Sequence, residues 1–84
     1  NYISHNTLDN NNNGIGLYVA GTGAKQHSFV GSNEIENNGF FGVYGQANSG
    51  AYQLVSIFTL GNTVTGNGAN YLFGTSGGAT NNIY

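Results

Sequence analysis

The chain has 84 residues, of which 5% are charged, with one basic residue, two His, no Cys and a formal net charge of −2. A single basic side chain cannot neutralise a row of phosphates, so the composition excludes electrostatic binding of nucleic acid. The lack of Cys argues against a zinc centre, and no apolar run is long enough to cross a membrane. We therefore expect no metal, no cofactor and no membrane partner.

Short runs of alternating apolar and polar residues recur along the chain between Gly and Asn breaks. These runs are rich in aromatic and β-branched side chains, which predicts short β-strands. In chain order they span residues 1–3, 15–19, 27–30, 41–44, 56–59 and 69–73. No stretch keeps a helical period with caps, so we predict an all-β chain with little or no helix.

Three Asn-Gly pairs, Asn13-Gly14, Asn38-Gly39 and Asn67-Gly68, precede three of these runs. They predict turns, because both residue types accept a positive φ. The first of these turns has one residue more than the others, so the columns of equivalent residues slip there. Residues 20–25 and 46–51 are predicted to form loops or widened turns.

A phrase of six residues recurs three times. It opens at Asn6, Asn33 and Asn62, which are 27 and 29 residues apart, and it has Asn at its first and sixth places and an aliphatic residue at its third. A fixed period in the twenties is typical of stacked supersecondary units rather than of a domain with one centre. We predict a single β-solenoid segment of about three coils, spanning approximately residues 1–27, 28–56 and 57–84.

The first residue of each phrase predicts a ladder of side chains. Successive coils of a solenoid lie one strand spacing, about 4.8 Å, apart. At that spacing a buried Asn can donate to one neighbour in its column and accept from the other. We expect Asn6, Asn33 and Asn62 to form this ladder; the alternative is that they are ordinary turn residues.

The phrase Asn-x-aliphatic-x-x-Asn, followed by Gly and an alternating apolar strand, resembles the repeat of right-handed parallel β-helices. That repeat occurs in pectate-lyase-like folds, alginate epimerases, NosD-type proteins and phage tailspikes. The resemblance covers nearly all 84 residues and implies a right-handed parallel β-helix, with coils longer than is usual in the family. The catalytic motif Asp-Pro-His-Glu of alginate epimerases is absent, since the chain contains no Pro.

The two ends of the chain fall at the same phase of the repeat. Tyr2, Phe29 and Phe58 each precede a phrase by four residues, and Tyr84 follows Phe58 by 26. Both ends should expose strand edges and an apolar cross-section. We expect further coils of a parent protein, or other subunits, to stack on these ends. The chain also lacks an initiating Met, which predicts a processed product or a piece of a longer solenoid.

Two acidic residues are candidates for catalysis. If the first and third places of each phrase face inward, Asp9 and Glu36 lie in one outward column on adjacent coils, with Glu34 on the same face. Carboxylates about 5 Å apart could act as an acid and a nucleophile on a glycosidic bond, or bind a hard cation. The alternative is a solvated face, and Thr65 ends the acidic column in the third coil.

A second outward column is expected in the strands that follow the phrases. If Leu17, Val43 and Leu72 face inward, the rings of Tyr18, Tyr44 and Phe73 face outward. A row of exposed rings suits the apolar faces of sugars, so these are the candidate glycan-binding residues. The alternative is that the rings stack only to stabilise the sheet.

Other polar combinations point to no reaction. Ser4, His5 and Asp9 contain the residue types of a nucleophile triad, but adjacent residues on a strand face opposite sides. The resemblance and the two columns together predict a segment of an extracellular carbohydrate-active protein that binds an extended polysaccharide. Its type would be a polysaccharide lyase, an epimerase or a glycoside hydrolase. The alternative is a structural or adhesive β-solenoid without catalysis, such as a segment of a phage tailspike or surface fibre. Either function would place it outside the cell or on a cell or virion surface.

Overall fold

The computed structural model describes residues 1–57 and 60–84, and in this part of the chain it contains strands and no helix. The strands are short because residues with positive φ interrupt the alternating runs; they are glycines together with His5, Asn10, Ser32, Asn37 and Ser49. The ten strands are β1 (Tyr2–Ser4), β2 (Thr7–Asp9), β3 (Asn13–Ala20), β4 (Lys25–Gly31), β5 (Glu34–Glu36), β6 (Phe41–Asn48), β7 (Tyr52–Ser56), β8 (Thr63–Thr65), β9 (Ala69–Thr75) and β10 (Thr80–Ile83).

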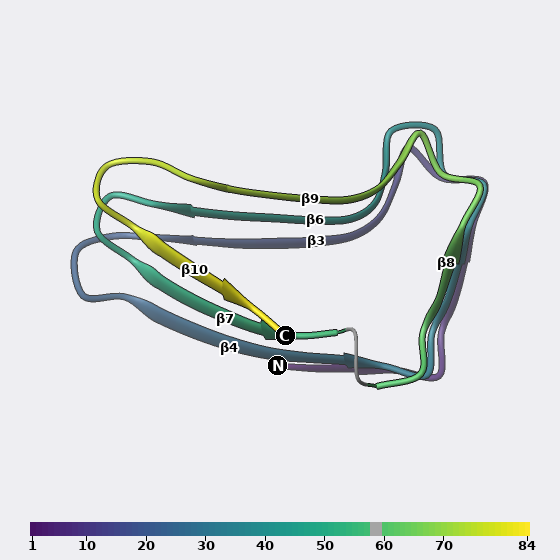
Figure 1. The fold of residues 1–84 in the computed structure, drawn as a ribbon, viewed down its shortest axis with the longest axis horizontal. Helices are drawn as coiled ribbons and strands as arrows, with labels where there is room; N and C mark the ends of the chain where they lie inside the picture. Colours follow the sequence, from purple (N-terminus) through teal and green to yellow (C-terminus); the bar gives the residue numbers. More distant parts are fainter. Residues whose placement is uncertain (58–59) are drawn as a thin grey trace.

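The strands form three sheets, and every strand pair is parallel. Sheet A has the order β1-β4-β7-β10, sheet B has β2-β5-β8 and sheet C has β3-β6-β9. The chain visits A, B and C in turn and then returns to A one layer further on (Figure 1). One such circuit is called a coil here: β1–β3, β4–β6 and β7–β9 are the first, second and third coils, and β10 begins another layer. The predicted all-β class and parallel, solenoid-like pairing are confirmed.

The register of sheet A corrects one member of the predicted aromatic column, which contained Tyr2, Phe29, Phe58 and Tyr84. Phe29 pairs with Tyr2 in one neighbouring strand and with Ser56 in the other. Tyr84 lies beside Ser56, because its N–H donates to Val55 O at 2.8 Å and its carbonyl accepts from Ile57 N at 2.6 Å. Tyr84 therefore does share the column of Tyr2 and Phe29. The third member, however, is Ser56 and not Phe58, which lies outside the described residues.

The register of sheet C corrects the predicted position of the longer turn. Asn13 pairs with Phe41, and Phe41 pairs with Ala69. The second coil therefore has one residue more than the first and third between its last phrase residue and this column. Asn13-Gly14 is not a turn but the start of β3. The predicted loops are shorter than expected, since β3 continues to Ala20 and β6 to Asn48.

Two of the three corners use the same backbone device. The residue before each ladder asparagine at the corner between sheets A and B has a positive φ: 57° at His5, 56° at Ser32 and 70° at Gly61. The corner between sheets B and C repeats this at Asn10, Asn37 and Gly66. A single residue in the left-handed region turns the chain sharply and interrupts the alternation of side chains along the strand. The asparagine that follows it can therefore point inward at the corner.

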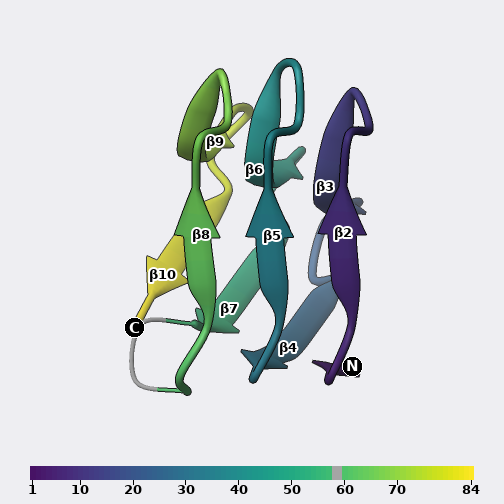
Figure 2. The ribbon, with the colours of Figure 1, turned by 90° about the vertical axis from the view of Figure 1, so that its right-hand side faces the viewer.

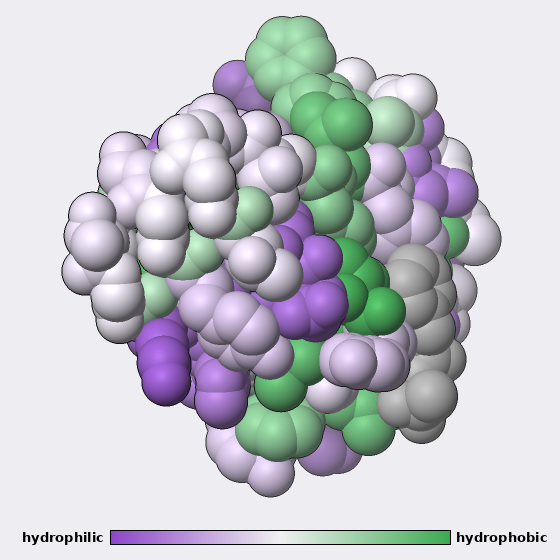
Figure 3. Space-filling model, turned by 60° about the vertical axis from the view of Figure 1, so that its left-hand side comes forward, coloured by the Kyte–Doolittle hydropathy of each residue, from purple (hydrophilic) through white to green (hydrophobic). Residues whose placement is uncertain are grey.

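The core is a stack of aliphatic side chains inside the three sheets. The second coil is its best-protected layer, since Val30, Ile35 and Val43 have no exposed surface. Side chains at the two ends of the stack pack on this core but remain partly exposed: Ile3 and Leu8 at one end, and Val64, Tyr71, Phe73 and Ile83 at the other. In the view of Figure 3, hydrophobic surface runs as a band between polar regions. Each coil therefore depends on its neighbours to cover its apolar layer.

Sheet A also contains an inward column of amides, Gln26, Gln53 and Asn81. Gln53 Nε2 donates to Gln26 Oε1 at 2.7 Å, and Gln26 Nε2 donates to Tyr18 O at 3.0 Å. Within the described part of the chain, Gln53 Oε1 and Asn81 Oδ1 are buried without a hydrogen-bond partner. A buried amide oxygen in that state lowers stability.

We expect Gln53→Met to raise the free energy of unfolding by about 1 kcal/mol. Removing a wholly buried, half-satisfied amide should outweigh the loss of one hydrogen bond, because the freed Gln26 Oε1 is only half-buried and can bind water. Gln26→Met is the matched control, since it leaves both ends of the Gln53 amide unpaired and should destabilise the protein. Urea unfolding measures both, and a loss of stability in Gln53→Met would contradict this account.

Candidate functional site

The three asparagines that open the phrases stack at the corner between sheets A and B. Asn6 N and Nδ2 donate to Asn33 Oδ1 at 3.0 and 3.1 Å, and Asn33 N and Nδ2 donate to Asn62 Oδ1 at the same distances. The Nδ2 group of Asn33 also donates to Ile3 O at 2.8 Å. Asn33 is only 3% exposed. These bonds satisfy backbone groups that the corner would otherwise leave unpaired.

A second column of asparagines stands at the corner between sheets B and C. Asn11 N donates to Asn38 Oδ1 at 3.0 Å, and Asn38 N and Nδ2 donate to Asn67 Oδ1 at 2.9 Å. Asn38 Nδ2 also donates to Leu8 O at 2.9 Å. The sequence marks this column by the Asn at the sixth place of every phrase. The predicted ladder included only the Asn at the first place, so it missed this second column.

The two candidate catalytic carboxylates lie on adjacent strands. Asp9 in β2 pairs in register with Glu36 in β5, and the next residue in that column is Thr65. Asp9 is exposed and Glu36 is half-buried. Asp9 Oδ1 accepts a hydrogen bond from Asn37 Nδ2 at 3.1 Å. The structure thus brings the two acidic residues to adjacent strands on one face of sheet B, with their backbones one strand spacing apart.

The predicted column of Tyr18, Tyr44 and Phe73 is wrong. Tyr18 pairs with Gln46, Tyr44 pairs with Gly16 and Leu72, and Phe73 pairs with Gly45, so the three rings belong to three different columns. The prediction placed the longer turn in the first coil, whereas the extra residue lies in the second coil. Leu72 is 44% exposed and faces outward, whereas Phe73 packs on the core. The Tyr18 ring is exposed, and the Tyr44 ring stacks on Phe41 at 5.5 Å.

A different pair of rings forms an exposed aromatic surface. Tyr2 in β1 and Phe29 in β4 stack with their centroids 5.1 Å apart and their planes 20° from parallel. Their side chains are 83% and 39% exposed. The two rings border a largely apolar hollow of about 240 Å³ that Ser4, His5 and Ser32 also line. Parallel strands hold the rings in register, so they present one continuous apolar edge.

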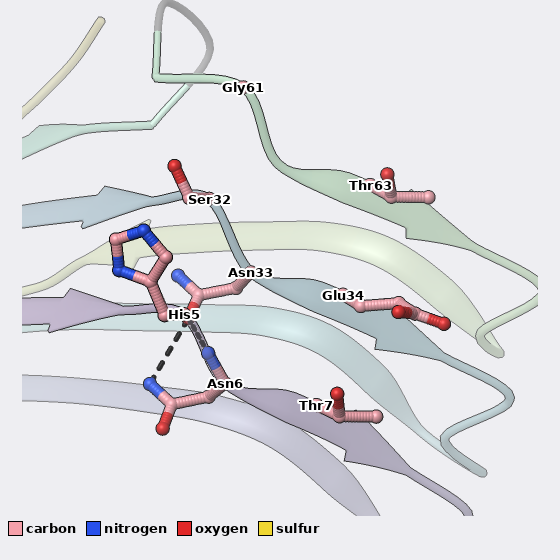
Figure 4. A pocket seen from close by; sticks show the side chains of 8 residues that line it. All are labelled: His5, Asn6, Thr7, Ser32, Asn33, Glu34, Gly61 and Thr63. Atoms are coloured by element: carbon pink, nitrogen blue, oxygen red, sulfur yellow. Dashed lines mark hydrogen bonds between the residues drawn. The ribbon is translucent and has the colours of Figure 1, made fainter.

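The hollow adjoins a polar cleft of about 400 Å³ at the corner between sheets A and B. Thr7, Glu34 and Thr63 extend to the same side from neighbouring coils, and the His5 ring stands beside Ser32 at the corner (Figure 4). His5 and Ser32 line both the hollow and the cleft. The backbone conformation at His5 and Ser32 holds both side chains at this corner, which gives a cleft with an imidazole, a carboxylate and several hydroxyls.

The electrostatics of the surface are mild. Burial raises the pKa of the Tyr71 phenol above its ordinary value of 10.0, so this side chain stays neutral at physiological pH. Among residues 1–57 and 60–84, no three or more His, Asp or Glu side chains gather as metal ligands do. The same part of the chain has no helix of the length and apolar character needed to span a bilayer.

Comparisons with protein-family models, with curated proteins and with solved structures give no match for this chain. The features of the molecule that bear on its function are the corner cleft, the Tyr2–Phe29 ring pair and the column of Asp9 and Glu36.

Proposed function

We propose that this chain is a glycan-binding segment of a carbohydrate-active, right-handed parallel β-helix protein that works outside the cell or on a cell or virion surface. The ligand is an extended polysaccharide that runs along the corner between sheets A and B. The observation that carries the proposal is the exposed Tyr2–Phe29 stack beside a cleft lined by hydroxyl, amide and carboxylate groups. Flat apolar edges next to hydrogen-bonding groups match the two kinds of surface that a sugar ring presents.

The reaction type within this proposal is glycosidic or uronate chemistry at the acidic column. Asp9 and Glu36 are in register on the same sheet as Thr7, Glu34 and Thr63 of the cleft. A glycan that leaves the corner and crosses sheet B along its strands would pass both the cleft and the carboxylate pair. Asp9 and Glu36 would then act as acid and nucleophile, for which retaining glycosidases use carboxyl groups about 5 Å apart.

The second candidate is a structural or adhesive solenoid without catalysis. This candidate is favoured because many polar side chains form hydrogen bonds between coils. Six asparagines form the two ladders, and Asn37 donates a hydrogen bond to the Asp9 carboxylate. A carboxylate that serves as a hydrogen-bond acceptor between coils would then stabilise a rigid spacer rather than a reaction.

We expect Tyr2→Ala to weaken polysaccharide binding about tenfold, because loss of a stacking ring should remove about 1.4 kcal/mol. Calorimetric titration with alginate, polygalacturonate and a neutral β-glucan measures this. Tyr18→Ala is the matched control: Tyr18 is exposed to a similar degree as other surface rings but lies in sheet C, away from the cleft. Equal losses in both variants, or no binding by the unaltered chain, would contradict the proposed site.

Turnover on the same polysaccharides separates the two candidates. Product release that disappears in Asp9→Asn and Glu36→Gln, with folding unchanged by circular dichroism, supports the enzyme. Binding without turnover supports the structural or adhesive alternative.

A further inference from the structure

The outward face of sheet B carries every carboxylate side chain of the sequence. Its strands β2, β5 and β8 lie side by side in Figure 2, and the middle residue of each strand points into the core. The outward side chains are Thr7, Asp9, Glu34, Glu36, Thr63 and Thr65. The sequence has three acidic residues in total, so all of them stand on this surface, which we call the acidic face.

The only Lys or Arg of the sequence, Lys25, lies far from the acidic face. It begins β4, whereas Gly31 at the end of that strand leads into the corner with sheet B. The turn before β4 and sheet B lie at opposite ends of the long axis in Figure 1. The two ends of the seven-residue strand β4 are about 20 Å apart. That separation is about twice the Debye length at 0.1 M salt, so Lys25 does not neutralise the acidic face.

The carboxylates of the acidic face are available to a ligand. Within the described part of the chain, the side chains of Glu34 and Glu36 form no hydrogen bond or ion pair, whereas Asp9 Oδ1 accepts a hydrogen bond from Asn37 Nδ2 at 3.1 Å. Asp9 and Glu34 are exposed, and Glu36 is half-buried. The amino group of Asn1 is not among their partners, because it donates to a backbone carbonyl in sheet A.

The acidic face is continuous with the proposed glycan site. Glu34 lines the corner cleft, and Asp9 and Glu36 follow along the same strands. The Tyr2–Phe29 stack borders the hollow that adjoins the cleft. A sugar chain that stacks on the rings and enters the cleft therefore has carboxylates beside it on the sheet B side.

We propose that the glycan of this site is a polymer of amino sugars with free ammonium groups, such as a glucosamine polymer, and not a polyuronate. The inference rests on the proposed function and names the substrate class of the same site. An ammonium group donates charge-assisted hydrogen bonds to carboxylates, while the sugar ring stacks on the aromatic pair. A polyuronate would bring its own carboxylates against those of the acidic face, and like charges repel. The charge of the face thus favours glycosidic chemistry over uronate chemistry.

The test is calorimetric titration of the 84-residue chain with three sugars of equal length, the hexamers of glucosamine, N-acetylglucosamine and galacturonate. A mildly acidic buffer keeps the amines of glucosamine protonated. The glucosamine hexamer should bind about tenfold more tightly than the N-acetylglucosamine hexamer, the combined value of two exposed ion pairs of about threefold each. The galacturonate hexamer should bind most weakly. The difference between the first two hexamers should shrink as the salt concentration rises.

Two charge variants separate local recognition from net charge. Glu34→Gln removes the cleft carboxylate and should weaken binding of the glucosamine hexamer about threefold more than that of the N-acetylglucosamine hexamer. Lys25→Gln is the matched control, because it makes the net charge more negative by one at an exposed position far from the cleft, and it should leave both affinities unchanged. His5 also lines the cleft. His5→Asn removes the imidazole and keeps a residue type that accepts a positive φ, and the preference for glucosamine should persist in it.

Tighter binding of the glucosamine hexamer that Glu34→Gln reduces and Lys25→Gln does not reduce supports the proposal. Equal binding of the glucosamine and N-acetylglucosamine hexamers, or equally tight binding of the galacturonate hexamer, overturns it and leaves glycan binding itself intact. A hexalysine peptide that binds as tightly as the glucosamine hexamer also overturns it, because charge alone would then explain the affinity. Absence of binding by all three hexamers overturns it as well, and the proposed function fails with it if the neutral β-glucan is not bound either.

Discussion

Asn33→Ala is expected to lower the free energy of unfolding by about 3 kcal/mol. The substitution removes the acceptor of Asn6 N and the donor to Ile3 O, and it leaves Asn62 Oδ1 with fewer donors. Each buried polar group left unpaired costs about 1–3 kcal/mol. Because Asn33 is the middle rung, the loss falls on both coil interfaces.

Urea unfolding followed by far-UV circular dichroism gives this free energy. The matched control is Asn12→Ala, an identical change at an exposed asparagine outside both ladders, which should change stability by less than about 0.5 kcal/mol. An Asn33→Ala midpoint equal to that of the unaltered chain would mean that the ladder contributes nothing to stability.

The second large effect is expected for Gly42→Ala, with a loss of about 2–3 kcal/mol. A Cβ at Gly42 would lie 2.7 Å from both Asn67 Nδ2 and Asn70 O, and 2.9 Å from Val64 Cγ1. Asn70 O belongs to the backbone of β9 and cannot rotate away. The methyl group must therefore push β9 and the second ladder outward, which separates the second and third coils.

Gly16→Ala is the control for this prediction, because a Cβ there meets nothing within 4 Å. Since Gly16 lies in a strand and has no positive φ, the change should be neutral or slightly stabilising. Thermal unfolding of both variants tests the contrast. The clash also predicts that Gly42→Ala and Asn67→Ala are not additive, because both act on the same ladder contact. Equal stability of the two glycine variants would refute the packing account.

The parts of the fold that could be predicted lie where the repeat keeps its length. Leu8, Ile35 and Val64 share one column because each phrase has six residues without an insertion, so spacing alone gave their register. The same regularity placed Asp9 beside Glu36. Within such a segment only one face of the strand can be buried. The alternation of apolar and polar residues is therefore sufficient to predict the register.

Prediction failed where coils differ in length. Ser56 precedes Asn62 by six residues, whereas Phe29 precedes Asn33 by four, so counting back from the phrase selected Phe58 in place of Ser56. In sheet C the extra residue of the second coil places Tyr44 beside Gly16 and Leu72, whereas Phe73 shares the inward column of Leu17. An insertion can be accommodated at several points of a corner, and packing, not the local pattern, decides which strand residues remain in register.

The corner cleft could not be predicted from the sequence, for a different reason. Its position depends on left-handed backbone at His5, Ser32 and Gly61, which are three different residue types. Only Gly among them strongly favours that conformation on its own, so no common letter marks the column. The asparagine ladder beside it stabilises the corner, and the structure was needed to show that the residue before each phrase has a left-handed backbone.

The coil period also determines how this chain can fold. Paired strands join residues about 27–29 positions apart, so no strand pairing is local. The first pairing has to close a long loop, and its entropic cost recurs for each further coil, which makes folding a slow nucleation followed by propagation. The first and third coils never pair with each other in the described sheets. Every strand pair except β7–β10 includes a strand of the second coil. We therefore expect the folding nucleus to include strands β4–β6, and substitutions in that coil should slow refolding more than equivalent substitutions in the first coil.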